Sequence, residues 1–171
     1  MNPKEPFYYE EIQKMDQWWY RLAILIGPAV IWTLFLLQVV FGIEVDKDPG
    51  TEIVLTIVWL LVGIFMPWYL LSSRLITVIA SDGIYVRFKP YHFKYQRFLF
   101  SDIEKVETMT YRAIRDFGGY GIKFVKNTKI YNVKGNKAIK IFFKNGKSLV
   151  IGTQVPDQLD ASIRNVFRPK M

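Results

Sequence analysis

The chain has 171 residues, of which 51% are hydrophobic, and its formal net charge is +8 at pH 7. It contains no cysteine, which excludes disulfides, thiolate nucleophiles and cysteine-ligated metal sites and suits a reducing compartment. A single histidine, His92, leaves at most one candidate base for serine–histidine chemistry, so we expect no enzyme, no cofactor and no metal site.

The N-terminal segment, residues 1–21, mixes charges of both signs with prolines and aromatic rings. This mixture does not resemble a signal peptide, so we expect the apolar run that follows to stay in the mature protein. The apolar spacing over 11–19 predicts a short interfacial helix. Aromatic rings and cations that flank an apolar run favour the level of the lipid headgroups. The membrane-interface residues that we expect on this basis are Trp18, Trp19, Tyr20, Arg21 and Arg74.

Two apolar runs, 22–43 and 53–73, contain no Asp, Glu, Lys or Arg. A helix rising ~1.5 Å per residue would make each run ~32 Å long, which is enough to cross the hydrocarbon core of a bilayer. Residues 22–73 are therefore expected to form a two-span transmembrane hairpin with a short acidic extracytoplasmic loop at 44–52. The bias of Lys and Arg to the other side predicts a multi-pass protein of the cell (inner, cytoplasmic) membrane with both termini in the cytoplasm.

Residues 74–171 read as one small basic domain. Short runs rich in β-branched and aromatic residues alternate with turn signals, and the first four of them are expected to form a meander. The pair Asn145-Gly146 predicts a type I′ hairpin. Apolar residues at helical spacing over 156–167 predict a C-terminal amphipathic helix. The expected strands are 75–80, 84–88, 95–100, 103–110, 122–125, 138–143 and 148–152.

Seven strands and a terminal helix are the elements of a pleckstrin-homology-like (PH-like) barrel. Segments 81–84 (SDGI), 117–122 (FGGYGI) and 149–154 (LVIGTQ) are similar to stretches that recur in bacterial PH-like membrane proteins, many of them uncharacterised. The resemblance covers nearly the whole chain. It implies an α+β membrane protein, with an N-terminal transmembrane helical hairpin followed by a PH-like seven-stranded β barrel or sandwich capped by a C-terminal helix.

The resemblance also implies a binding or scaffolding role, and it transfers no catalytic residue. Phosphoinositide-reading PH domains place a Lys-rich motif across their first two strands and the loop between them. The corresponding loop here, 81–83, carries Asp82 and no lysine. Inositol-phosphate recognition in that mode is therefore not expected.

A long segment without acidic residues, between Asp116 and Asp157, is the strongest candidate for a binding surface. Its lysines either form a solvated face that keeps the domain soluble or attract the domain to anionic lipid headgroups or a partner. Each lysine near an anionic leaflet contributes ~1 kcal/mol of attraction. Strand alternation places successive side chains on opposite faces, so these lysines need not share one patch. They are Lys123, Lys126, Lys129, Lys134, Lys137, Lys140, Lys144 and Lys147.

Aromatic residues alternate with these lysines as in nucleic-acid stacking platforms, but no nucleic-acid motif accompanies them, and nucleic acid is not an expected partner. The glycine run at 118–121 predicts a bulge or a tight turn into a strand, since it lacks the ending of a phosphate-binding loop. We expect a membrane-anchored, non-enzymatic module that binds a partner membrane protein, a second copy of itself or the anionic membrane surface. The alternative is an accessory subunit of a larger transport or cell-envelope complex.

Overall fold

The computed structural model describes residues 3, 6–42 and 49–167. Most of the expected acidic loop at 44–52 lies outside the described residues. The chain divides into two compact units, Met1–Lys14 with Ser73–Met171, and Met15–Ser72. We call the first the β unit and the second the helical unit.

The helical unit contains two helices that are long and apolar enough to cross a membrane, Trp18–Gln38 with a mean hydropathy of 1.9 and Ile53–Leu71 with 2.2. Helix α1 (Trp18–Val39) forms the first. The second consists of α2 (Pro49–Val58), a π-helical stretch η1 (Trp59–Phe65) and α3 (Met66–Leu71). The two apolar helices expected from the sequence are thus present.

A hydrogen bond joins these two helices at the carbonyl of Gly63, a residue of η1. The indole Nε1 of Trp32 in α1 donates a hydrogen bond to this carbonyl at 3.2 Å. The ring of Trp32 also meets that of Trp59 edge to face, with 5.1 Å between centroids. The hydrogen bond and the ring contact therefore hold α1 against η1.

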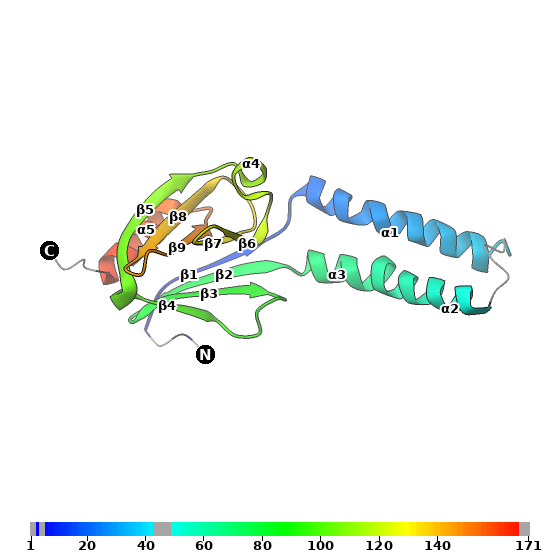
Figure 1. Ribbon diagram of the computed structural model, residues 1–171, viewed down its shortest axis with the longest axis horizontal. Coiled ribbons are helices and arrows are strands. Elements are labelled where there is room, and N and C mark those ends of the chain that lie inside the picture. The colour runs from blue at the N-terminus through cyan, green and yellow to red at the C-terminus, as the bar shows by residue number, and fades with distance from the viewer. Residues whose placement is uncertain (1–2, 4–5, 43–48, 168–171) are drawn as a thin grey trace. The chain divides into compact units, whose positions relative to one another are not determined.

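The β unit consists of two sheets and two helices (Figure 1). The first sheet is antiparallel, in the order β1 (Phe7–Lys14), β2 (Arg74–Ala80), β3 (Gly83–Lys89) and β4 (Gln96–Leu99). Strand β1 was not expected. Residues 11–14, for which we predicted an interfacial helix, end this strand, and helix α1 begins only at Trp18, so that prediction is wrong.

The second sheet has the order β5-β8-β9-β7-β6. Its strands are β5 (Ile103–Thr110), β6 (Gly121–Val125), β7 (Thr128–Asn132), β8 (Lys137–Phe143) and β9 (Ser148–Gly152). Strand β7, which is not among the strands expected from the sequence, pairs in parallel with β9. A 3₁₀ turn, η2 (Phe100–Asp102), carries the chain from β4 into this sheet, so the expected four-stranded meander ends after β4.

Helix α4 (Ala113–Phe117) lies between β5 and β6, and helix α5 (Pro156–Val166) packs against β8, β5 and β1. Its buried side chains, Leu159 and Ile163, confirm the amphipathic helix predicted over 156–167. The described strands number nine, and both sheets keep free edges, at β1 and β4 in one and at β5 and β6 in the other. An α+β fold with a C-terminal helix is therefore confirmed. Of the seven-stranded barrel or sandwich that we expected, the strand number is wrong, and the described residues form two sheets and no closed barrel.

Strand β1 ties the two sheets together. The side-chain amide of Gln13 donates a hydrogen bond to the carbonyl of Gly152 at 2.7 Å. The carboxylate of Glu11 accepts bonds from the hydroxyl of Thr153 at 2.7 Å and from the backbone N–H of Gln154 at 2.9 Å. Because both partners follow β9, the segment before the helical unit is part of the β fold.

The hairpin predicted at Asn145-Gly146 joins β8 to β9, but its turn type differs from the prediction. A type I′ turn needs a positive φ at both central residues. Gly146 has a φ of 76°. Asn145 has no positive φ, because Lys126 is the one non-glycine residue with a positive φ in the described part of the chain. The N–H of Gly146 donates to the carbonyl of Phe143 at 2.9 Å. One positive-φ glycine therefore suffices for this turn.

Candidate functional site

A pocket of about 400 Å³ opens in the β unit between β4, η2 and the turns that join β6 to β7 and β8 to β9. Three phenylalanines supply its apolar walls, Phe98, Phe124 and Phe143, and the rings of Phe98 and Phe143 stack with 5.8 Å between centroids. Polar groups come mainly from the two turns. We call this site the basic pocket, because its lining includes the cations Arg97, Lys126, Lys129 and Lys147.

Lys126 occupies a strained backbone position. It is the first residue of a two-residue turn, since Val125 pairs with Thr128, and its φ is 52°. A side chain in this left-handed region costs ~1 kcal/mol, and glycine is the residue that adopts it freely. Strain of this kind is often kept at functional sites, where a particular side chain is needed.

Lys129 projects from β7 between aromatic rings. Its Nζ lies 5.4 Å from the ring centroid of Phe124 and 5.0 Å from that of Tyr131. Partial burial lowers the pKa of Lys129. In the part of the chain that the structure describes, no carboxylate pairs with Lys126, Lys129 or Lys147. An anionic ligand would therefore restore interactions that burial has removed from Lys129.

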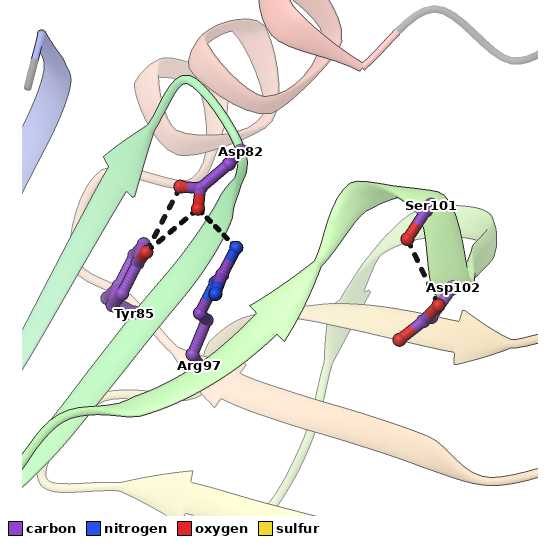
Figure 2. Close-up of polar contacts among 5 residues, drawn as sticks. All are labelled: Asp82, Tyr85, Arg97, Ser101 and Asp102. Atoms are coloured by element: carbon purple, nitrogen blue, oxygen red, sulfur yellow. Dashed lines mark hydrogen bonds and ion pairs between the residues drawn. The ribbon is translucent and has the colours of Figure 1, made fainter. Parts of the chain in front are cut away.

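Arg97 differs from the lysines because its charge is already compensated. Figure 2 shows its guanidinium bonded to the carboxylate of Asp82, with Nη2 and Oδ2 2.5 Å apart. The hydroxyl of Tyr85 donates to the same carboxylate at 3.1 Å. The acidic loop 81–83 thus positions a cation at the pocket, which the sequence did not indicate.

The carboxylate that lines the basic pocket is that of Asp102. Its Oδ1 accepts a hydrogen bond from the hydroxyl of Ser101 at 3.1 Å, as Figure 2 shows. The charge of Arg97 is compensated by Asp82, so the comparison is between three lysines and the carboxylate of Asp102. The pocket is consequently a site of net positive charge with acceptors at its rim.

The eight lysines predicted as one binding surface separate in the structure. Lys126, Lys129 and Lys147 line the basic pocket. Lys140 lies across from Glu107 on the other face of the second sheet, and its Nζ sits 4.6 Å from the ring of Phe142. The remaining lysines do not line the pocket: Lys123 in β6, Lys134 between β7 and β8, Lys137 at the start of β8, and Lys144, whose Nζ donates to the carbonyl of Ser101 at 2.6 Å.

The residues predicted for the membrane interface occupy the first turn of α1 and the start of β2. Trp18 and Trp19 have exposed fractions of 73% and 42%. The rings of Trp19 and Tyr20 meet edge to face, and Arg21 is exposed. Arg74 is the first residue of β2 and is also exposed. Their role at a membrane surface stays a prediction.

His92 lies in the loop between β3 and β4. Its Nδ1 accepts a hydrogen bond from the backbone N–H of Phe88 at 3.4 Å, and its ring meets that of Tyr131 edge to face. Burial, together with the nearby charge of Lys129, lowers the pKa of His92. The ring is therefore held neutral near pH 7, with a structural role in its loop. Among the described residues, no group of three or more His, Asp or Glu side chains could hold a metal ion.

A search of curated proteins finds no match to the chain. A protein-family model described as "Family of unknown function (DUF6141)" matches residues 1–168. This agrees with the uncharacterised family expected from the resemblance. The match covers nearly all of the chain, and the protein therefore belongs to DUF6141, a family of unknown function.

Proposed function

We propose that this protein is a membrane-anchored, non-enzymatic binding module, whose β unit binds an anionic group in the basic pocket on the cytoplasmic side. The observation that carries the proposal is the convergence of Lys126, Lys129 and Lys147 on one pocket, without a pairing carboxylate among the described residues. One of these lysines sits at a strained φ and another is partly buried.

The anchor in this proposal is the helical unit. Only 11% of the most apolar window of each helix is buried, so most of the apolar surface is left for lipid to cover. Two helices cannot enclose a pore, and the apolar runs 22–43 and 53–73 carry no charged side chain that would mark a transport path. The β unit, in our proposal, is an open PH-like variant whose first strand precedes the anchor.

The pocket lies at one end of the β unit. Strand register places the β8–β9 turn beside Ile103, and the backbone N–H of Lys144 donates to the carbonyl of Asp102 at 3.0 Å. This end of the sheets is opposite to the one at which Lys14 pairs with Arg74, the residues at which the β unit connects along the chain to the helical unit. The placement favours a ligand that reaches the pocket from water over a lipid of the anchoring membrane.

The ligand chemistry follows from the lining. Lysine ammonium groups act as point charges for phosphate or carboxylate, and a pocket of about 400 Å³ is within the size range of small-molecule sites. Asp102 and Asn127 are available to accept hydrogen bonds from hydroxyl groups. A small hydroxylated phosphate ester combines these features.

The test uses the full chain in detergent micelles and calorimetric titration. Glycerol 3-phosphate and inorganic phosphate are the soluble probes, and short-chain phosphatidylglycerol is the lipid probe. Removing one charged hydrogen-bond donor costs ~1.5–3 kcal/mol, so Lys129→Met should weaken binding of a soluble probe by about tenfold or more. Lys137→Met, a matched change outside the pocket, should leave affinity within about twofold.

Two results would contradict the proposal. One is equal weakening by Lys129→Met and Lys137→Met, which would mean that general charge and not the pocket attracts the probe. The other is the absence of binding by both soluble probes and the lipid probe. Tighter binding of the lipid probe that still depends on Lys129 would keep the pocket and change the source of its phosphate.

A further inference from the structure

The chain crosses between its two units at one end of the first sheet. β1 ends at Lys14, and β2 begins at Arg74, directly after Ser73. Lys14 pairs with Arg74, and Arg74 pairs with Lys89 of β3. Neighbouring strands lie ~4.8 Å apart, so the base of the β3–β4 loop is two strands from Lys14 and one from Arg74. We call this end of the β unit the crossing end.

The second sheet reaches the same end through α4. Gln13, one residue before Lys14, bonds to Gly152 at the end of β9. Gly152 pairs with Ala138, and Lys137, the residue before Ala138 in β8, pairs with Thr110, after which the chain leads into α4. The β3–β4 loop and helix α4 therefore both belong to the crossing end.

Each of these two segments exposes a large apolar side chain. Phe93 in the β3–β4 loop is 87% exposed, and Ile114 in α4 is 75% exposed. Tyr91, two residues before Phe93, is 50% exposed. Single exposed apolar residues are ordinary, but here two of them lie at the same end of the β unit, one carried by each sheet.

The backbone behind both tips is held in place. In the β3–β4 loop, the carbonyl of His92 accepts a hydrogen bond from Nε of Arg87 at 3.2 Å, and the backbone N–H of His92 donates to the carbonyl of Phe88 at 2.8 Å. In α4, the carboxylate of Asp116 accepts the backbone N–H of Arg112 at 2.8 Å. The apolar tips are therefore presented by ordered turns.

Cations lie at the same end of the β unit as the tips. Lys14, Arg74 and Lys89 form one cross-strand row, with side chains on the same face of the sheet. Lys94 follows Phe93 in the sequence and is exposed. Arg112 and Arg115 flank Ile114 in the sequence, and Arg115 is paired with Asp116 at 3.1 Å. Aromatic and apolar tips among lysines and arginines are the composition that binds the headgroup layer of an anionic membrane.

We propose that the crossing end of the β unit rests on the bilayer, with Phe93 and Ile114 inserted at the level of the lipid headgroups. This inference rests on the membrane anchoring in the proposed function, and it adds a second, peripheral attachment that limits the orientations of the β unit. The basic pocket, at the opposite end, then opens toward water. An anionic lipid surface is the partner that we infer for this end, because the cations supply charge complementarity.

Because the natural chain has no cysteine, single cysteines can carry an environment-sensitive nitrobenzoxadiazole label without background. Phe93→Cys and Ile114→Cys report the crossing end, in full-length protein reconstituted in nanodiscs that contain phosphatidylglycerol. Phe124→Cys, 72% exposed at the basic pocket, is the matched control at the opposite end. Leu34→Cys, within α1, reports whether the helical unit is in lipid at all.

We expect labels at 93 and 114 to be quenched by nitroxide-bearing lipids and to be quenched severalfold less by aqueous iodide than the label at 124. Replacing phosphatidylglycerol with phosphatidylcholine should increase iodide access at 93 and 114. If these two labels are as accessible to iodide as the one at 124 while Leu34→Cys is quenched by lipid, the inference is overturned and the anchor stands. Shielding at 93 and 114 without lipid quenching also overturns it, since a protein surface would then be the occupant. Loss of lipid quenching at 34 would instead overturn the anchoring itself.

Discussion

The bond network of Glu11 predicts that a residue placed before the helical unit stabilises the β unit that follows it. The carboxylate accepts hydrogen bonds from Thr153 and Gln154, across to the second sheet, and from the hydroxyl of Tyr9 at 3.0 Å. A hydrogen bond to a charged group contributes ~1.5–3 kcal/mol, and Thr153 is buried, so its hydroxyl loses an acceptor that water cannot replace. Because Glu11 is only partly buried, we take the low end of this range for each of two bonds. Glu11→Ala should therefore lower the free energy of unfolding of the β unit by about 3 kcal/mol.

The assay is pulse proteolysis of the full chain in detergent micelles across a urea series. Tryptophan fluorescence would not serve, because all five tryptophans lie between residues 18 and 68, in the helical unit. Glu10→Ala is the matched control, since Glu10 is the exposed neighbour whose side chain points to the opposite face of the strand. We expect this control to stay within ~0.5 kcal/mol of the natural chain. Equal effects of the two substitutions would refute the role assigned to the carboxylate.

Three further substitutions test local geometry. Gly83→Ala would place a Cβ 2.3 Å from the carbonyl oxygen of Phe98, so we expect a loss of more than ~2 kcal/mol in the same urea assay, and unchanged stability would contradict this close approach. Lys126→Gly should stabilise the β unit by ~1 kcal/mol, because glycine adopts the positive φ without strain. The same variant should bind glycerol 3-phosphate more weakly in calorimetry. A stabilised variant with full affinity would show that Lys126 does not take part in binding. Trp32→Phe removes the indole N–H that donates to the carbonyl of Gly63. We expect the free energy of unfolding of the helical unit, measured by detergent-induced unfolding, to fall by ~1 kcal/mol. An unchanged free energy would show that this hydrogen bond does not stabilise the helical unit.

The elements predicted well are those whose signal is local. An uncharged apolar run long enough to span a bilayer needs no tertiary partner to be recognised, and the amphipathic spacing over 156–167 marks helix α5 in the same way. The strands at 75–80, 84–88 and 138–143 also carried their own β-rich composition and flanking turns. In each case the pattern lies within a single segment of sequence.

The elements missed are those defined by a distant partner. Strand β1 pairs with β2 across the whole helical unit, and its buried side chain Gln13 bonds to Gly152, so its strand character depends on residues far away in the chain. Strand β7 reads as polar, yet its parallel pairing with β9 buries Ile130 and Tyr131. Neither pairing has a signature in the segment itself.

The candidate site likewise combines a local signal, which the sequence carries, with a choice of residues that depends on distant partners. The sequence indicated a lysine-rich segment without acids, and it could not select Lys126, Lys129 and Lys147 from the eight, because that choice depends on turn geometry and on which face of a strand turns inward. Arg97 joined the site only because β4 lies beside the second sheet, and a resemblance to PH-like proteins did not locate it.

Composition and hydrophobic period act over neighbouring residues, so they were enough to predict the two apolar helices, the basic β-rich remainder and the terminal helix. The folded structure was needed to place the first strand in the β unit and to show that the sheets stay open. It was also needed to bring three lysines together at one end of the β unit while Phe93 and Ile114 are exposed at the other. Those features come from pairing between segments far apart in the chain, and such pairing follows from how whole sheets bury their apolar faces.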